Sequence, residues 1–110
     1  MAEDELPEVT VDEAIALVAA GTVLVDVREQ NEWDAGHAPD ARFLPLSELP
    51  ERYAELPEDT RFLVVCHAGG RSLRATKFLQ AQGYDAVNVI GGMTAWGEAG
   101  GALTANTDGA

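Results

Sequence analysis

The sequence predicts an α/β domain with a mostly parallel central sheet and helices on both faces. Three short apolar runs rich in β-branched residues alternate with segments of helical periodicity. Strands that are apolar throughout are typical of parallel sheets, because helices cover both of their faces. The length of 110 residues suits one such domain. We place this single domain at residues 9–100, with flexible tails at residues 1–8 and 101–110.

The first helix and the first strand have the clearest local signals. Thr10 and Glu13 fit a capping box, which predicts a helix that begins at Val11 and stops before Gly21. The β-branched run at residues 22–27 then predicts a strand that is buried on both faces.

A long connection separates this strand from a second predicted helix. The connection runs from Glu29 to Pro45 and leaves room for a short helical turn near Glu32. Residues 47–56 then predict a helix. Pro50 falls near its start, where a missing N–H matters least.

The second half of the chain contains two further strands, each followed by a helix. Residues 61–65 form an apolar run that leads straight into Cys66. A helix is expected from Arg71 or Ser72 to Gln82, where Gly83 stops it. Residues 86–90 predict the third strand, and a short last helix is expected at residues 93–98 after a glycine turn.

The charge of the chain is strongly acidic and unevenly spread. The formal net charge is −12, with sixteen acids and three arginines in residues 1–60 but three acids and four bases in residues 61–110. Nucleic acid and an anionic membrane are therefore poor partners, and an anion is favoured only in the second half. We interpret the acid excess as a solvated surface rather than as an acidic docking face.

Two further features bear on location. No apolar run is long enough to cross a bilayer. The acidic N-terminus, MAEDELPEVT, lacks the basic and apolar segments of a secretory signal. We therefore expect a cytoplasmic protein.

The chain contains one cysteine, Cys66, in the stretch VCHAGGRS. One cysteine excludes a disulfide within the chain. His37 and His67 are too few to complete a zinc site of the usual kind, so we expect neither a metal nor a cofactor. Taken alone, a cysteine at the end of an apolar run is most simply a small buried hydrophobe.

The residues that follow Cys66 favour a reactive thiolate instead. Gly69 and Gly70 permit positive φ and a close approach of a ligand to the backbone. The loop N–H groups and the N-terminus of the next helix can converge on the sulfur, and Arg71 adds a charge suited to an oxyanion. These groups lower the pKa of a thiol. We therefore predict Cys66 as a nucleophile and a binding loop for an anionic substrate, made of His67, Ala68, Gly69, Gly70, Arg71 and Ser72.

Asp26 and Arg28 are predicted to lie at the same edge of the sheet as Cys66. Each group lies at the carboxyl end of a predicted strand, and parallel sheets bind ligands beyond the carboxyl ends of their strands. With Glu32 they are either an acid–base set or an ion-pair network that braces this edge, and we favour the network. His37 is expected to be a structural hydrogen-bonding residue. For His67 two interpretations remain equally open. Its side chain either influences which molecules react at Cys66, as donor or as acceptor of a transferred group, or it simply points to solvent.

Three stretches in order resemble the single-domain rhodaneses, which are rhodanese-homology sulfurtransferases. The resemblance runs from about Val11 to Gly100. It rests on DVRE with the following Glu-Trp and Gly-His, on CHAGGRS, and on GGMTAW, which occupy residues 26–37, 66–72 and 91–96.

This resemblance implies a thiosulfate sulfurtransferase. The Cys66 thiolate would take the outer sulfur of a small anionic donor such as thiosulfate, and the resulting persulfide would pass it to cyanide, a thiol or a protein. With no second cysteine in the chain, the acceptor must be external.

Two alternatives remain. One is a sulfur-relay or regulatory binding module with little turnover of small donors, whose acidic half docks a basic partner. The other, a phosphatase or arsenate reductase, is disfavoured because four residues separate Cys66 from Arg71, one fewer than in those enzymes.

Overall fold

The computed structural model describes residues 6–105 and contains a five-stranded parallel sheet. Its strand order is β1-β5-β4-β2-β3, and all neighbours are parallel. In chain order the strands are β1 (Glu8–Val9), β2 (Val23–Asp26), β3 (Arg42–Phe43), β4 (Phe62–Val65) and β5 (Ala86–Val89). The prediction of an α/β domain with a parallel sheet is confirmed.

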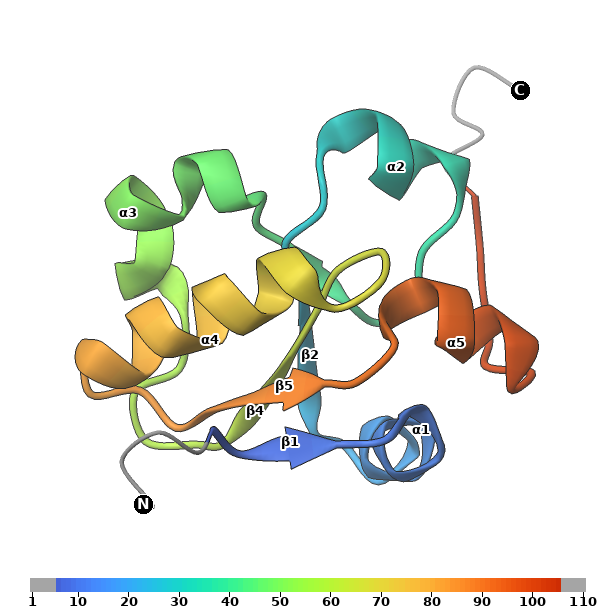
Figure 1. The fold of residues 1–110 in the computed structure, drawn as a ribbon, viewed down its shortest axis with the longest axis horizontal. Coiled ribbons are helices and arrows are strands. Elements are labelled where there is room, and N and C mark those ends of the chain that lie inside the picture. The colour runs from blue at the N-terminus through green and yellow to red at the C-terminus, as the bar shows by residue number, and fades with distance from the viewer. Residues whose placement is uncertain (1–5, 106–110) are drawn as a thin grey trace.

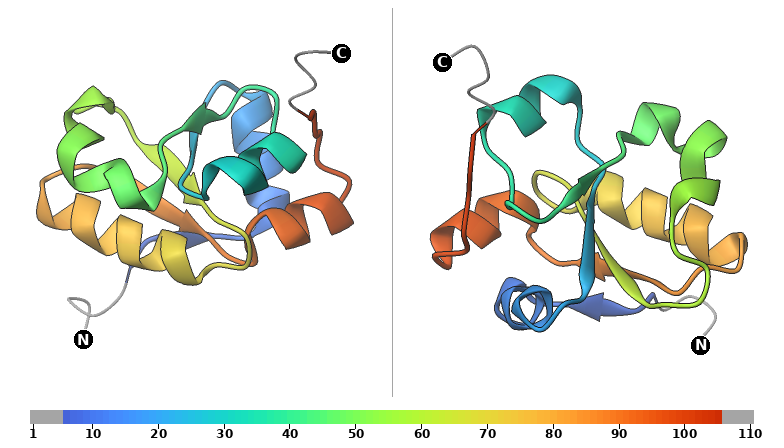
Figure 2. Two further views of the ribbon diagram at one scale, coloured as in Figure 1. Left: turned by 90° about the horizontal axis from the view of Figure 1, so that it is seen from above. Right: turned by 180° about the vertical axis from the view of Figure 1, so that it is seen from behind.

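Helices cover both faces of this sheet. They are α1 (Val11–Ala19), α2 (Gln30–Ala35), α3 (Leu49–Arg52), α4 (Gly70–Ala81) and α5 (Gly92–Glu98). The views agree that α1 and α5 lie on one side of the strands, and that α3 and α4 lie on the other (Figures 1 and 2). None of the helices in the described part of the chain has the length and apolar character that a membrane span requires.

The central strand β4 separates two hydrophobic clusters. Phe62 and Val64 belong to the cluster beneath α3 and α4, whereas Leu63 and Val65 belong to the cluster beneath α1 and α5. Successive side chains of a strand point to opposite faces, so an apolar run can fill both layers at once. The predicted burial of this strand on both faces is confirmed, since all four residues are buried.

The predicted start of α1 is confirmed in detail. The Glu13 backbone N–H donates to the Thr10 hydroxyl at 3.2 Å, and the Thr10 N–H donates to the Glu13 carboxylate at 2.8 Å. Such a reciprocal capping box satisfies two N–H groups that the first helical turn leaves without partners.

The predicted helix over residues 47–56 is wrong as a continuous α-helix. The structure divides it into 3₁₀ segments at Leu46–Glu48 and Tyr53–Glu55 on either side of the four-residue helix α3. Pro50 lies in the first turn of α3, as expected. Its ring clashes with an α-helical carbonyl four residues earlier, so the α-helix cannot extend back through Leu46.

Short pairings occur in segments that we expected to be tails or connections. Glu8 pairs with Asn88 in β1, and Thr104 bonds to His37 through both backbone groups at 2.8 Å. The strand β3 lies within the expected connection after β2. The outer parts of the expected tails, residues 1–5 and 106–110, lie outside the described residues.

Candidate active site

Cys66 lies where β4 ends, at one edge of the sheet. The loop from Cys66 to α4 (yellow in Figure 1) emerges between α4 and α5 and faces α2. Asp26 at the end of β2 is in register with Val65, the residue before Cys66. The two polar strand ends that the sequence placed at one edge are therefore neighbours.

The loop turns its backbone N–H groups back toward the sulfur. Gly69 adopts a φ of +119°, in the left-handed region, and its N–H donates to Cys66 Sγ at 3.0 Å. A side chain at this position would be strained, which explains the glycine. The expectation of positive φ at Gly70 is wrong, because Gly70 is already the first helical residue of α4.

The environment of Cys66 favours the thiolate. Burial of the side chain works to raise the thiol pKa, but hydrogen bonds outweigh it and hold the pKa below its ordinary value. These hydrogen bonds come from the Ser72 hydroxyl and then from the backbone N–H groups of Ser72, Gly69 and Arg71. All of these donors lie in the last loop residue or the first turn of α4.

Helix α5 holds the other side of the same loop. The Met93 N–H donates to the Cys66 carbonyl at 2.7 Å, and the Thr94 N–H donates to the His67 carbonyl at 3.0 Å. Because N–H groups of α5 hydrogen-bond to these carbonyls, the carbonyls face α5 and the loop presents its N–H groups to the sulfur. Gly92 permits the contact, since a Cβ atom there would lie 2.4 Å from the His67 carbonyl oxygen.

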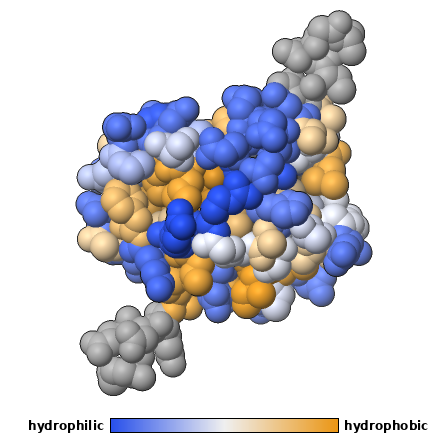
Figure 3. All heavy atoms as spheres, turned by 45° about the horizontal axis from the view of Figure 1, so that its top comes forward, coloured by the Kyte–Doolittle hydropathy of each residue, from blue (hydrophilic) through white to orange (hydrophobic). Residues whose placement is uncertain are grey.

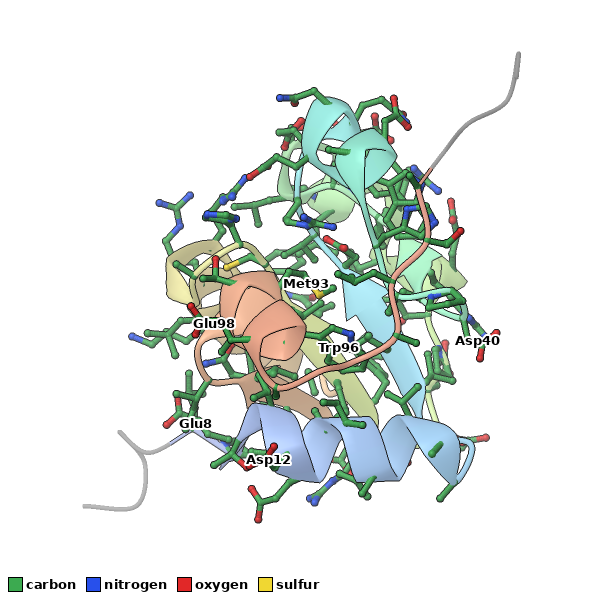
Figure 4. All side chains as sticks on the ribbon, turned by 90° about the vertical axis from the view of Figure 1, so that its right-hand side faces the viewer. Glu8, Asp12, Asp40, Met93, Trp96 and Glu98 are labelled. Atoms are coloured by element: carbon green, nitrogen blue, oxygen red, sulfur yellow. The ribbon has the colours of Figure 1, made fainter. Side chains whose placement is uncertain are left out.

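Side chains of α5 anchor it against the sheet. Met93 and Trp96 are 6% and 3% exposed and point from α5 into the molecule (Figure 4). The Trp96 indole also donates to the carbonyl of Ala102 at 3.0 Å. Trp96 therefore belongs to the hydrophobic core on this side of the sheet.

Arg71 is engaged by helix α2. Its two terminal nitrogens donate to the two carboxylate oxygens of Glu32, each at 2.7 Å. The hydrogen bond from Arg71 is the main reason that the pKa of Glu32 falls from 4.5 to about 2. The guanidinium fork thus ties α4 to α2, while its positive charge stays near the sulfur.

Asp26 and Arg28 form a second, separate ion pair. Both side chains are buried, and the Arg28 Nη2 lies 2.8 Å from Asp26 Oδ2 and donates to the Gly36 carbonyl at 2.7 Å. The pair therefore fixes the chain where it passes from β2 through α2. The structure brings the predicted carboxylates and arginines together as two pairs, Asp26–Arg28 and Glu32–Arg71, rather than as one network.

The two histidines have different surroundings. His37 stacks on Trp33 with ring centroids 3.6 Å apart, and its Nδ1 lies 2.7 Å from the Trp33 carbonyl. This confirms a structural hydrogen-bonding residue. His67 lies in the loop itself and is exposed, and its Nε2 lies 3.3 Å from the Thr94 hydroxyl.

Asn88 is a site residue that the sequence reasoning missed. It lies on β5 and accepts a hydrogen bond from the Ser72 hydroxyl at 2.6 Å. The one signal that could have identified it is a polar amide inside an otherwise apolar predicted strand.

The face that carries the strand ends is largely polar. Figure 3 shows hydrophilic residues over much of it, with the most hydrophilic ones at its centre. Within residues 6–105, no group of three or more His, Cys, Asp or Glu side chains is placed to hold a metal ion.

Comparison with known proteins identifies the relatives of this chain. The family described as Rhodanese-like domain matches residues 10–99. The chain is 40% identical over 73 residues to the protein YtwF of Bacillus subtilis, covering 66% of this chain and 71% of that protein. It is 41% identical over 75 residues to a sulfurtransferase of Allochromatium vinosum, covering 67% of this chain and 70% of that protein.

A solved structure shows the same similarity in three dimensions. The crystal structure of a rhodanese-related protein from Thermoplasma volcanium superposes with a TM-score of 0.83 at 34% identity. The match covers 89% of this chain and 97% of that one.

Proposed function

The chain belongs to the rhodanese-like domain family, and from this membership we propose that it is a sulfurtransferase whose nucleophile is Cys66. The relative from Allochromatium vinosum is itself a sulfurtransferase, which supports the reaction class. The observation that carries the proposal is the set of N–H groups and the N-terminus of α4 that surround the sulfur. A thiolate is the nucleophilic form of cysteine, and this environment favours it.

In the first step the thiolate attacks the outer sulfur of an anionic donor such as thiosulfate. A new S–S bond forms between Cys66 Sγ and that outer sulfur, and the S–S bond of thiosulfate breaks. The leaving sulfite keeps the electron pair of the broken bond. The product is a persulfide on Cys66, whose negative charge the loop N–H groups stabilise as an oxyanion hole does.

In the second step an external acceptor takes the terminal sulfur. Cyanide, a thiol or a protein attacks that sulfur, a new bond to sulfur forms, and the Cys66 thiolate is released. Cys66 itself is only 1% exposed. An S–S bond of about 2 Å carries the terminal sulfur outward from this position, which makes it easier to reach.

The test is the mass of the intact protein after incubation with thiosulfate. The protein should gain the mass of one sulfur atom, lose it again with cyanide, and yield thiocyanate. Cys66→Ser should show no gain, whereas Ser47→Ala, an exposed serine on the 3₁₀ segment before α3, should behave as the unchanged protein. An unmodified mass and no thiocyanate from folded protein would refute the proposal.

The acidic first half of the chain favours a second candidate, a sulfur-relay or regulatory binding module that serves a basic protein partner. In that case Cys66 would accept sulfur from a protein persulfide but would turn over thiosulfate and cyanide negligibly. Comparing the two donors on the same protein separates the candidates. Turnover of an aryl phosphate would instead contradict both and favour a phosphatase.

A further inference from the structure

An open pocket of about 440 Å³ lies at the end of α4 that is remote from Cys66. Its aromatic and acidic lining residues come from the 3₁₀ segment after α3, the turn before β4 and the chain after α4, and they are Tyr53, Glu58, Asp59 and Tyr84. Figure 1 shows this end of α4 beside α3, whereas the loop after Cys66 begins the helix about 18 Å away, at 1.5 Å for each of its twelve residues. Ligand sites typically measure about 300–1,000 Å³, so the volume suits a small ligand.

The charge around this pocket is negative. Glu58 and Asp59 are exposed carboxylates, and neither forms an ion pair with a base in residues 6–105. Arg52 and Arg61, which flank the lining segments, are paired with other carboxylates. The carboxyl end of α4 adds partial negative charge, and its last turn contains no basic side chain. None of the described lining residues is basic, so the pocket favours a cation, whereas the loop after Cys66 favours an anion.

Two tyrosine rings line the same pocket. Tyr53 and Tyr84 pack edge to face, with ring centroids 5.9 Å apart and an interplanar angle of 88°. Tyr53 also packs on the edge of Phe78, with centroids 5.4 Å apart, so both rings are held in place. The face of an aromatic ring is negative and attracts ammonium and guanidinium groups. The pocket therefore combines aromatic surface with carboxylates.

The hydroxyl of Tyr84 is a polar group that the chain does not use. Tyr84 is only 6% exposed, yet its hydroxyl has no hydrogen-bond partner within residues 6–105. Buried tyrosine hydroxyls usually find a partner. Burial, and after it the charge of Glu58, raises the pKa of the Tyr84 phenol, so the phenol stays neutral at pH 7. Its oxygen can therefore accept a hydrogen bond from a ligand in the pocket, beside Glu58.

We propose that this pocket binds a guanidinium group at the end of an alkyl chain, in a small compound or in an arginine side chain. A guanidinium is planar, stacks on aromatic faces and carries five N–H donors, which suit the two carboxylates and the phenol oxygen. A metal ion is a poorer fit, because in the described residues no three acidic, His or Cys side chains converge to hold one. The inference is independent of the proposed role of Cys66.

An NMR titration of the full chain with n-butylguanidinium tests this inference. The ring resonances of Tyr53 and Tyr84 should shift and saturate, whereas those of Trp96, on the other face of the sheet, should not move. The matched ligand is n-butylurea, which has nearly the same shape but no charge. It should bind at least about tenfold more weakly, because hydrogen bonds from a charged donor are roughly twice as strong as neutral ones. Equal affinity for the two compounds, or shifts that do not saturate, would overturn the inference.

Two variants and a control show which groups hold the ligand. Glu58→Gln removes one carboxylate, and Tyr84→Phe removes only the hydroxyl, so each should weaken the binding of n-butylguanidinium by about fivefold. Glu51→Gln is the control, because Glu51 is an exposed carboxylate of α3 that does not line the pocket. Equal weakening in Glu51→Gln and Glu58→Gln would indicate a general attraction to the acidic surface and contradict the inference. Unchanged affinity in both Glu58→Gln and Tyr84→Phe would contradict it as well.

A short peptide separates the two sources of the guanidinium group. Tighter binding of acetyl-Gly-Arg-Gly-amide than of n-butylguanidinium would assign the pocket to an arginine side chain of a polypeptide, and weaker binding would assign it to a small compound. Cys66 alkylation should proceed at the same rate in Glu58→Gln and Tyr84→Phe, because the pocket lies at the opposite end of α4. This rate also verifies that the variants are folded.

Discussion

The carbonyl groups of Cys66 and His67 decide which side of the loop faces the sulfur. A carbonyl oxygen directed at the thiolate would repel it, whereas an N–H group stabilises it. The first N–H groups of α5 take up both carbonyls, at 2.7 and 3.0 Å. Gly91 and Gly92, which begin α5, therefore support the sulfur site from outside the loop.

Gly92→Ala should disturb this arrangement severely. Gly92 has a φ of +62°, and its new Cβ would lie 2.4 Å from the His67 carbonyl oxygen. We expect a loss of about 2–4 kcal/mol in the free energy of unfolding, measured with urea, and slower Cys66 alkylation. Gly97→Ala in the same helix is the control, because its Cβ meets only Leu103 Cδ1 at 3.7 Å. Equal stability of the two variants would contradict the role assigned to Gly92.

Between elements, one ion pair joins the short helix α2 to the N-terminus of α4. Glu32 and Arg71 are 25% and 33% exposed, and both carboxylate oxygens are bonded. A bidentate, partly buried pair is worth more than an exposed one. The pair holds α2 over the side of the loop that α5 leaves open (Figure 1).

Glu32→Gln should reveal this contribution through its dependence on pH. The pKa of Glu32 is depressed to about 2 in the folded protein, so its ionised form stabilises the fold above pH 4.5. That stability is lost as the pH falls from 4.5 toward 2. We therefore expect Glu32→Gln to be less stable by about 1 kcal/mol at pH 7, with a difference that shrinks below pH 4.5.

Urea unfolding at several pH values measures this difference. Glu55→Gln is the matched control, because Glu55 bonds to Arg52 on an exposed surface and should contribute little. The free energy of unfolding of Glu32→Gln could instead differ from that of the unchanged protein by the same amount down to pH 3. The ionised pair would then not be the source of the difference.

The elements that the sequence predicted well are those that bury apolar faces. The bounds of α1 and β4 lie within one or two residues of prediction, because hydrophobic periodicity reports burial. The strands β1 and β3 have only two residues each, which is too short to show a hydrophobic periodicity. They complete the hydrogen bonds of their neighbours, as when the Asn88 N–H donates to the Pro7 carbonyl at 2.9 Å.

In the candidate site, too, features that depend on neighbouring residues could be predicted, whereas contacts between distant residues could not. The composition of the loop after Cys66 predicted a thiolate environment, since glycine and a helix N-terminus act locally. The partner of Arg71 could not be predicted with it, because Glu32 lies 39 residues earlier. Asn88 likewise reaches Ser72 only through the packing of α4 on β5.

At the scale of the whole molecule, the net charge of −12 opposes the approach of the anionic donor that we propose for the loop. The described residues span 47 × 30 × 24 Å. The screening length is about 30 Å in 0.01 M salt and about 8 Å in 0.15 M salt. At the lower salt concentration, most of the charge of the protein therefore acts on an approaching anion. At the higher salt concentration, only groups near the loop are effective. They include Arg71 and also Arg74, an exposed residue one turn further along α4.

Salt should therefore speed the reaction of Cys66 with anionic reagents. Iodoacetate is an anion, and iodoacetamide is its neutral counterpart of nearly the same shape. The alkylation rate with iodoacetate divided by the rate with iodoacetamide therefore isolates the electrostatic contribution to the rate. Screening removes roughly 1 kcal/mol of repulsion, so this ratio should rise by a factor of about five between 0.01 and 0.15 M salt. Arg74→Gln should lower the ratio mainly at high salt, because local charges then dominate. A ratio that falls with salt would mean that the basic groups at the loop, rather than the acidic bulk, control the approach of the donor.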